Sequence, residues 1–378
     1  MFLVFYFTMA GVMNAYVLWR VYLAFPGRVG IIAGGAAFQA VMIFTPLLAR
    51  MLERSAFSGV ARVLSFAGYC WMALVAWFVF YGVLCDCWNL ATRLTARLAP
   101  AAAKVLLPPR PALALILALI GASVAWAAVE ASWLRVSTVT VRTPRLPPGT
   151  PSIRIAHISD VHLSLVQPER ILRKVVSVIR TTKPDLLVCT GDMLDISWRR
   201  LQGQAELLAQ IQPPLGKFAV FGNHEYYVGV KNSEAFLKAA GVQVLRGESV
   251  LVGGRLRVVG VDDPAGRHFD EQCFTDEDVL LPPVGSRELT ILLKHRPLVR
   301  ESSLGRFDLQ LSGHTHGGQI FPMHLVIRAM YLYMPGLHAL PCGSWLYHSR
   351  GTGTWGPPLR FFAPPEVVII TLVPQDKA

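Results

Sequence analysis

Two histidines separated by one residue follow an apolar run in the second half of the chain. Residues 309–312 alternate in the manner of a buried strand, and Gly313 then precedes His314 and His316. Imidazoles two positions apart can converge on one centre when neighbouring glycines adopt backbone conformations that other residues resist. The same pair is also compatible with an ordinary polar turn, so its meaning depends on the rest of the chain.

Four other strand-like runs end in side chains that can bind metals or move protons. The runs span residues 153–159, 186–189, 218–221 and 289–293, and the side chains after them are those of Asp160, His162, Asp192, Asp195, Asn223, His224, Glu225 and His295. Helix-like segments at residues 168–180 and 201–211 separate the first three runs. This order predicts an α/β fold, a layered sandwich whose site collects at the carboxyl ends of the strands.

Seven of these groups are suitable ligands for hard or borderline metal ions. They are Asp160, His162, Asp192, Asn223, His295, His314 and His316. Seven donors are too many for one tetrahedral zinc ion, and they suit two metals that share a bridging ligand. Because no thiolate is needed, the set fits manganese, iron or zinc, and the sequence does not choose among them.

Several of the other residues also have simpler interpretations. His224 is compatible with a packed polar residue, and Asp195 with a helix cap. Arg199 and Arg200 follow the second block and are candidates for binding a substrate phosphate. A solvated surface pair is the more common outcome for two adjacent arginines.

The amino-terminal third of the chain has the composition of a membrane region. Hydrophobic residues make up 53% of the whole sequence and charged residues only 16%, which is too apolar for an ordinary soluble protein. Four windows without a charged side chain, residues 1–19, 29–49, 63–85 and 111–129, are each near the ~20 residues that cross a bilayer. They predict an all-α transmembrane anchor of four helices over residues 1–133. The windows contain no acid or base, which favours an anchor over a transporter.

The positive charge is concentrated in this membrane-like part. Residues 1–150 contain 12 Lys or Arg and 3 acids, which leaves 24 and 21 for the remainder. Such a distribution fits contact with anionic lipid headgroups, and no nucleic-acid partner is expected. Six basic residues fall on each side of the four predicted crossings, so the positive-inside rule leaves the side of the catalytic domain open.

A proline-rich stretch separates the two regions. Prolines between residues 142 and 151 remove backbone donors that a helix needs, so we expect a linker over residues 134–151 and a second domain over residues 152–378.

The ordered blocks resemble those of the calcineurin-like metallophosphoesterase superfamily. They are Asp160-x-His162, Gly191-Asp192-x-x-Asp195, Gly222-Asn223-His224-Glu225, His295 and Gly313-His314-x-His316, within residues 153–319. The segment 347–372 is similar to a branch of membrane-attached bacterial phosphoesterases. Some members of that branch act on the UDP-2,3-diacylglucosamine intermediate of lipid A synthesis. This resemblance implies an integral protein of a bacterial inner membrane.

The resemblance also implies a role for each residue. Asp160, His162 and His316 would hold the first metal, Asn223, His295 and His314 the second, and Asp192 would bridge them. His224 would protonate the leaving oxygen or stabilise its charge. Glu225 would orient His224, and Asp195 would hold a ligand in place. Substrate binding is assigned to Arg199, Arg200 and Arg350.

Together these features predict a membrane-anchored, dinuclear metal-dependent phosphoesterase. It would cleave a phosphoester or pyrophosphate bond through a metal-bridging hydroxide, with a lipid or nucleotide-linked lipid precursor as substrate. One alternative is a tethered phosphodiesterase or phosphatase for soluble nucleotides or phosphoproteins. Another is a sensor or scaffold with a vestigial phosphoesterase fold, although such folds usually lose ligands and none of the seven is missing.

The apolar segment after the histidine pair has two interpretations. Residues 320–340 are rich in Leu, Ile, Met and Tyr, and Arg328 is their only formally charged residue. The segment is either a core strand with its loop or an apolar rim that faces the bilayer beside the metals.

Overall fold

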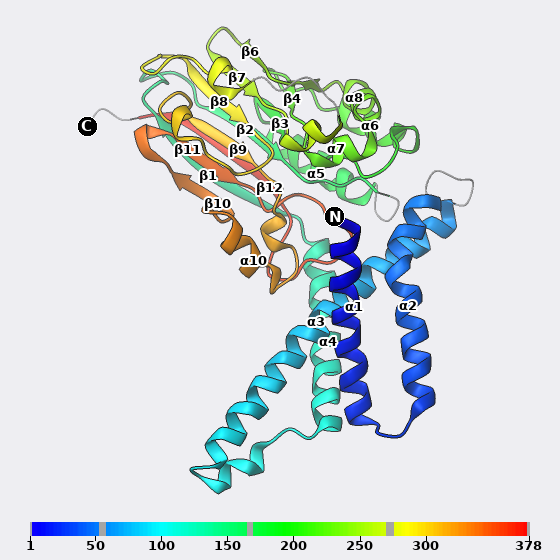
Figure 1. Cartoon of the computed structure of the whole chain (residues 1–378). Coiled ribbons are helices and arrows are strands. Elements are labelled where there is room, and N and C mark those ends of the chain that lie inside the picture. The colour runs from blue at the N-terminus through cyan, green and yellow to red at the C-terminus, as the bar shows by residue number, and fades with distance from the viewer. Residues whose placement is uncertain (1, 53–57, 165–168, 270–275, 376–378) are drawn as a thin grey trace. The chain divides into compact units, whose positions relative to one another are not determined.

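A computed structural model describes residues 2–52, 58–164, 169–269 and 276–375 (Figure 1). The chain divides into two compact units, one of residues 1–128 with 356–358 and the other of residues 129–355 with 359–378. The predicted starts of helical segments at Met1 and Pro168 lie outside the described residues.

Long helices form the first unit. They are α1 (Phe2–Ala24), α2 (Val29–Leu52), α3 (Ser58–Ala96), the short 3-10 helix η1 (Pro100–Val105) and α4 (Pro109–Ser132), whose last turn belongs to the second unit. Three segments, Val29–Leu52, Gly59–Ala96 and Pro109–Ser132, are long and apolar enough to cross a membrane. Helix α1 is not among them, so a fourth crossing stays a prediction.

Two six-stranded sheets form the frame of the second unit (Figure 1). In spatial order the first contains β1 (Arg135–Thr143), β12 (Glu366–Pro374), β2 (Ile153–Ile158), β3 (Leu186–Cys189), β4 (Lys217–Ala219) and β5 (Gln243–Val244). The second contains β10 (Gly336–Ala339), β11 (Trp345–His348), β9 (Leu309–Ser312), β8 (Leu289–Leu293), β7 (Leu256–Gly260) and β6 (Glu248–Val252). Strands β2 to β5 are parallel to one another, as are β7, β8, β9 and β11.

Helices and short turns occupy the outer layers and the connections. The helices are α5 (Arg170–Thr182), α6 (Gln202–Ala209), α7 (Asn223–Val228), α8 (Val230–Ala239), α9 (Glu277–Leu280) and α10 (Met323–Met330). The 3-10 helices are η2 (Trp198–Arg200), η3 (Pro264–Phe269), η4 (Glu301–Ser303), η5 (His316–Gly318) and η6 (Pro341–Gly343).

The alternation of side chains along the strands produces the layers. In β3, Leu186 and Val188 enter the core between the two sheets, whereas Leu187 and Cys189 enter the core beneath α5, α6 and α8. Strand β8 behaves in the same way, because Ile291 faces the first sheet and Leu292 faces the opposite side. The predicted α/β layered fold is therefore confirmed.

The structure differs from the sequence prediction within the expected linker. Residues 135–143 of the predicted linker 134–151 form β1, which pairs in parallel with β12 along its whole length. The prolines begin only at residue 144, after the strand has ended, so they do not interrupt its backbone hydrogen bonds.

A pair of matched substitutions tests whether β1 is an integral strand. Val141 is fully buried between the sheets and Val136 is about half exposed. Val141→Asn should destabilise the second unit by roughly 2–7 kcal/mol, because a buried amide would lack partners. Val136→Asn should have little effect. The measurement is the temperature at which residues 129–378 of the full chain become sensitive to a soluble protease. Equal tolerance of both substitutions would show that the segment is a linker after all.

Candidate metal centre

Five strand ends bring the predicted ligands together. Asp160 and His162 follow β2, Asp192 follows β3, Asn223 begins the helix after β4, His295 follows β8, and His314 and His316 follow β9. Because β2, β3 and β4 are parallel neighbours in one sheet and β8 and β9 are parallel neighbours in the other, their carboxyl ends meet at one edge of the sandwich.

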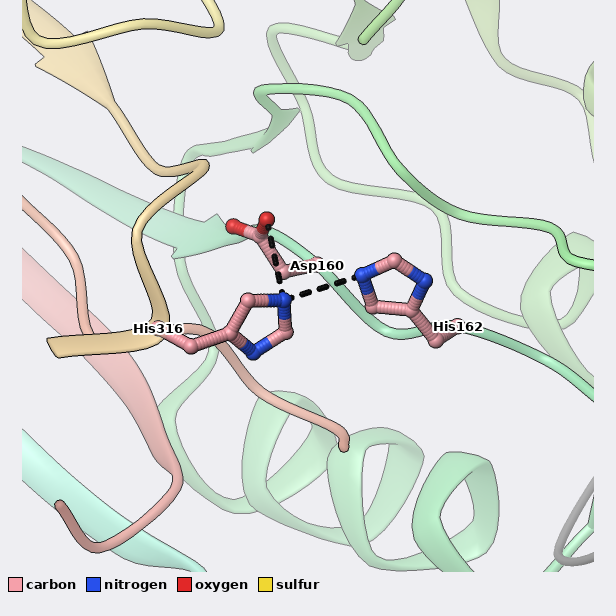
Figure 2. Close-up of side chains that lie close together, drawn as sticks. All are labelled: Asp160, His162 and His316. Carbon is pink, nitrogen blue, oxygen red and sulfur yellow. Dashed lines mark hydrogen bonds and ion pairs between the residues drawn. The ribbon is translucent and has the colours of Figure 1, made fainter. Parts of the chain in front are cut away.

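The first group consists of Asp160, His162 and His316 (Figure 2). The Nε2 atom of His316 lies 3.0 Å from Nε2 of His162 and 3.5 Å from Oδ1 of Asp160. Two imidazole nitrogens at this separation repel each other unless a proton or a cation lies between them. The arrangement is therefore suited to a shared positive ion.

The second group consists of Asp192, His295 and His314. Oδ2 of Asp192 lies 3.3 Å from Nε2 of His295 and 3.8 Å from Nε2 of His162. Nε2 of His295 lies 3.0 Å from Nδ1 of His314. Asp192 thus contacts members of both groups, which is the geometry expected of a bridging ligand.

Asn223 provides a test of whether the centre fits a metal. Its Oδ1 atom is buried and accepts no hydrogen bond from any described residue. A buried carbonyl oxygen without a partner is costly, and amide oxygens are good ligands for hard cations. The donor set of carboxylate, amide and imidazole groups together with this unpaired oxygen fits a divalent metal.

Hydrogen bonds fix the orientation of the imidazole rings. Asp195 Oδ1 lies 2.7 Å from Nδ1 of His162 and 2.8 Å from Nδ1 of His224. Nδ1 of His295 bonds to the carbonyl oxygen of Thr190 at 2.7 Å. Such partners select the tautomer whose Nε2 is free to bind a metal.

Glu225 has a different role from the predicted one. Its carboxylate accepts the backbone N–H groups of Gly222, Asp192 and Met193 at 2.7–2.8 Å. It therefore joins the loops after β3 and β4 instead of orienting His224. The orienting contact to His224 comes from Asp195.

Burial and charge shift the pKa values within the centre in opposite directions. Burial favours the neutral form of Asp192, but His295 and His224 outweigh it and hold the pKa of Asp192 well below its usual range. Burial also opposes charge on these imidazoles, yet Asp192 raises the pKa of His295 to about 10 and that of His224 to about 9. Burial lowers the pKa of His314 to about 2. A cation bound by His295 would have to displace a proton.

The ligand residues adopt an uncommon backbone conformation. Positive φ angles occur at Asp160 (53°), His162 (49°), Asp192 (52°), His314 (78°) and His316 (53°). Residues other than glycine rarely adopt this region, and such strain concentrates at functional sites.

Comparison with known proteins agrees with this geometry. The profile of the calcineurin-like phosphoesterase family matches residues 153–318. An uncharacterized metallophosphoesterase of Aquifex aeolicus is 43% identical over 249 residues, which are 66% of this chain and 95% of that protein. The chain belongs to the calcineurin-like metallophosphoesterases. The enzyme class predicted from the sequence, a hydrolase of phosphoester bonds, is thereby confirmed.

Two further relatives are also described as metallophosphoesterases or as having such a domain. YkuE of Bacillus subtilis, an uncharacterized metallophosphoesterase, is 31% identical over 259 residues, 65% of this chain and 87% of that protein. A Bos taurus protein described as a transmembrane protein with metallophosphoesterase domain is 32% identical over 252 residues. That match covers 63% of this chain and only 56% of the Bos taurus protein.

The three arginines that were predicted to bind substrate differ in their surroundings. Arg350 forms an ion pair with the buried Glu366 and a hydrogen bond to Ser137 at 3.2 Å, so its charge is used to hold β12 and β1. Substrate binding by Arg350 stays a prediction beside this structural role. Arg199 and Arg200 are exposed on η2, and substrate binding by them stays a prediction.

Sequence reasoning missed two supporting residues of this metallophosphoesterase. Arg360 is fully buried and donates to Nδ1 of His316 at 3.1 Å and to the carbonyl oxygen of His316 at 3.0 Å. His348 is also buried and bonds to the hydroxyl of Thr315, between the two histidines that follow β9, at 2.6 Å. Neither has a ligand-like spacing, so only the tertiary fold reveals them.

The bridging geometry of Asp192 leads to a test of metal content. Asp192→Asn should lower occupancy at both metal positions, because one oxygen set contacts both groups. Asp195→Asn also removes one negative charge, three residues further along the chain. It only weakens the support of His162, which should lower the affinity for metal by about 10–100-fold. Metal per protein after dialysis, measured by elemental analysis, compares the two. If Asp192→Asn retained one full equivalent at either position, the bridge assignment would fail.

Proposed function

We propose that this chain is a membrane-anchored, dinuclear metal-dependent phosphoesterase. The observation that carries the proposal is that Asp192 contacts His162 of the first group and His295 of the second, beside the unpaired buried oxygen of Asn223. One metal would be held by Asp160, His162 and His316, the other by Asn223, His295 and His314, and Asp192 would serve both. Manganese, iron and zinc all suit these ligands.

The bound cations would supply two things to the reaction. Bound there, they would acidify water, so that a nucleophile is available near neutral pH, and would neutralise the charge of the phosphate during in-line displacement. The protein holds their ligands in one orientation through Asp195, Thr190 and Arg360.

His224 is the group best placed to act on the leaving oxygen. Its ring stands edge-on to His162 at 4.6 Å, and its Nδ1 is held by Asp195. At 15% exposure its side chain is more accessible than those of His162, His295 and His316. The neighbouring carboxylates favour its protonated form, so it can donate a proton to the departing group. Its position also allows a ligand role, because it forms a third group with His162 and Asp192.

A membrane-lipid precursor is the favoured substrate class. Three segments of the first unit have the length and composition of membrane spans, and the Bos taurus relative is described as a transmembrane protein. The proposed setting is a bacterial inner membrane. A phosphoester that stays in the bilayer would meet a hydrolase tethered there at high effective concentration.

The direct experiment is a panel of phosphoesters assayed with the full chain under manganese, iron or zinc. The panel includes p-nitrophenyl phosphate, bis-p-nitrophenyl phosphate, a soluble dinucleotide and a UDP-linked acylated glucosamine in detergent. Metal-dependent cleavage of the acylated compound well above the soluble ones supports the proposal. Preference for soluble nucleotides would support a tethered phosphodiesterase. If no compound were cleaved, the result would support a sensor or scaffold with a vestigial phosphoesterase fold.

A single substitution separates the proton-donor role of His224 from a ligand role. His224→Ala should lower kcat by about 10²–10⁴-fold, the usual contribution of a general acid, while metal content stays near normal. Both quantities are measured on the same preparation. A parallel loss of metal would identify His224 as a ligand.

A further inference from the structure

Helix α10 exposes apolar side chains that a short helix of a soluble domain would normally bury. None of its eight residues is buried. Together with two nearby residues it forms what we call the interfacial surface, made of Met323, Leu325, Val326, Met330, Leu332 and Phe362. Leu332 is 86% exposed and Phe362 is 68% exposed. A contiguous apolar surface of this kind marks a contact site.

Aromatic packing makes this surface one continuous feature. Phe362 stacks on Phe361 with ring centres 4.4 Å apart, and Phe321 meets Phe362 edge-on at 5.9 Å. Phe321 also stacks on His324 of α10 at 4.7 Å. The two parts of the interfacial surface are therefore fixed to each other, although they are at least thirty residues apart in sequence.

The charge of the region suits an anionic partner. No Asp or Glu occurs between Asp308 and Glu366, and α10 carries the exposed Arg328. Apolar side chains next to a cationic one are the composition of helices that lie in the headgroup layer of a bilayer. The sequence alternative of a core strand and loop is not what residues 323–330 form.

The same surface is hydrogen-bonded to the end of a candidate membrane span. Glu130, in the last turn of α4 and part of the second unit, is buried and accepts the backbone N–H of Phe362 at 2.7 Å. Trp133 follows that turn, is 60% exposed, and lies against Arg135 at 5.5 Å. Tryptophan and arginine are the residues that anchor a span at the membrane–water boundary. This places Phe362 at the level where α4 would leave the bilayer.

We propose that the interfacial surface seats in the headgroup and upper acyl region of the bilayer. The inference rests on the proposed membrane anchoring. It goes further by naming the part of the catalytic unit that touches lipid. Tyr331, directly after α10, lies 6.1 Å from the ring of His314. A phosphate at the headgroup level is thus brought beside the metal centre while its acyl chains remain in the membrane.

Site-specific photocrosslinking tests the seating directly. p-Benzoylphenylalanine replaces Leu325, Leu332 or Phe362 in the full chain, which is reconstituted in vesicles of phosphatidylethanolamine and phosphatidylglycerol. Val284 is a matched control at 75% exposure in the same unit, and Val63 of α3, at 66% exposure, reports on membrane insertion. Mass spectrometry should find lipid adducts at the three surface positions and at Val63, but not at Val284.

Each other outcome overturns the proposal in a distinct way. Adducts at Val63 without adducts at the three surface positions would leave the anchoring intact and remove the seating. Adducts to a second protein copy at those positions would show that the surface binds protein. Absence of adducts at Val63 would overturn both the anchoring and the seating, whereas hydrolysis of p-nitrophenyl phosphate tests the metal centre independently.

A kinetic comparison gives a second test that does not rely on the crosslinker. Replacing Leu325, Met330 and Leu332 together with Ser should raise KM for a lipid phosphoester in vesicles by about tenfold or more. KM for p-nitrophenyl phosphate should not change. Val279 and Val284, both exposed elsewhere on the unit, serve as the matched pair for Ser substitution. Equal changes for both substrates would contradict the seating.

Discussion

The metal centre depends on holding five non-glycine residues at positive φ, a conformation that costs on the order of 1–3 kcal/mol for each residue. Loop-to-loop hydrogen bonds offset this cost. The N–H of Asp160 bonds to the carbonyl of Gly191 and the N–H of His162 to that of Asp192, each at 3.0 Å. The N–H of His314 bonds to the carboxylate of Asp160, also at 3.0 Å. The loops after β2, β3 and β9 therefore hold one another in the strained form, and none of them could keep it alone.

Two glycines of the motifs, Gly313 and Gly222, contribute by allowing close approach. A side chain at Gly313 would place its Cβ 1.9 Å from the hydroxyl of Ser159, and one at Gly222 would place it 2.2 Å from Asp192. Neither glycine has a positive φ. The sequence interpretation, in which glycines supply unusual backbone angles so that the histidines can converge, holds for the two glycines after His316, since Gly317 and Gly318 have φ angles of 60° and 85°. Five ligands adopt positive φ as well, and Gly313 and Gly222 leave room for the neighbouring loop.

The local alternation of apolar residues was sufficient to predict the strands that precede the candidate metal ligands, because each apolar run is followed at once by the side chains that could bind a metal. It was not sufficient for β1, whose partner β12 begins more than two hundred residues later, so no nearby signal distinguishes that strand from a linker. The contacts of Glu225 and Arg350 were missed for a related reason. Glu225 accepts from Gly222 of its own motif, a contact that a helix-capping pattern could have predicted. Its other partners, the N–H groups of Asp192 and Met193, and the carboxylate of Glu366 that pairs with Arg350 lie outside the motifs.

The two groups of candidate ligands are not equivalent in their surroundings. In one, Nδ1 of His295 bonds to a carbonyl oxygen, which increases the basicity of the ligand nitrogen. In the other, Nδ1 of His316 accepts from the buried guanidinium of Arg360, so a neutral His316 ring carries its proton on Nε2, the atom that faces Asp160 and His162. Arg360 also bonds to the carbonyls of Arg350, Gly353 and Ala363. The same guanidinium therefore fixes the carboxy-terminal segment beside His316, and a cation bound at Nε2 of His316 would have to displace a proton.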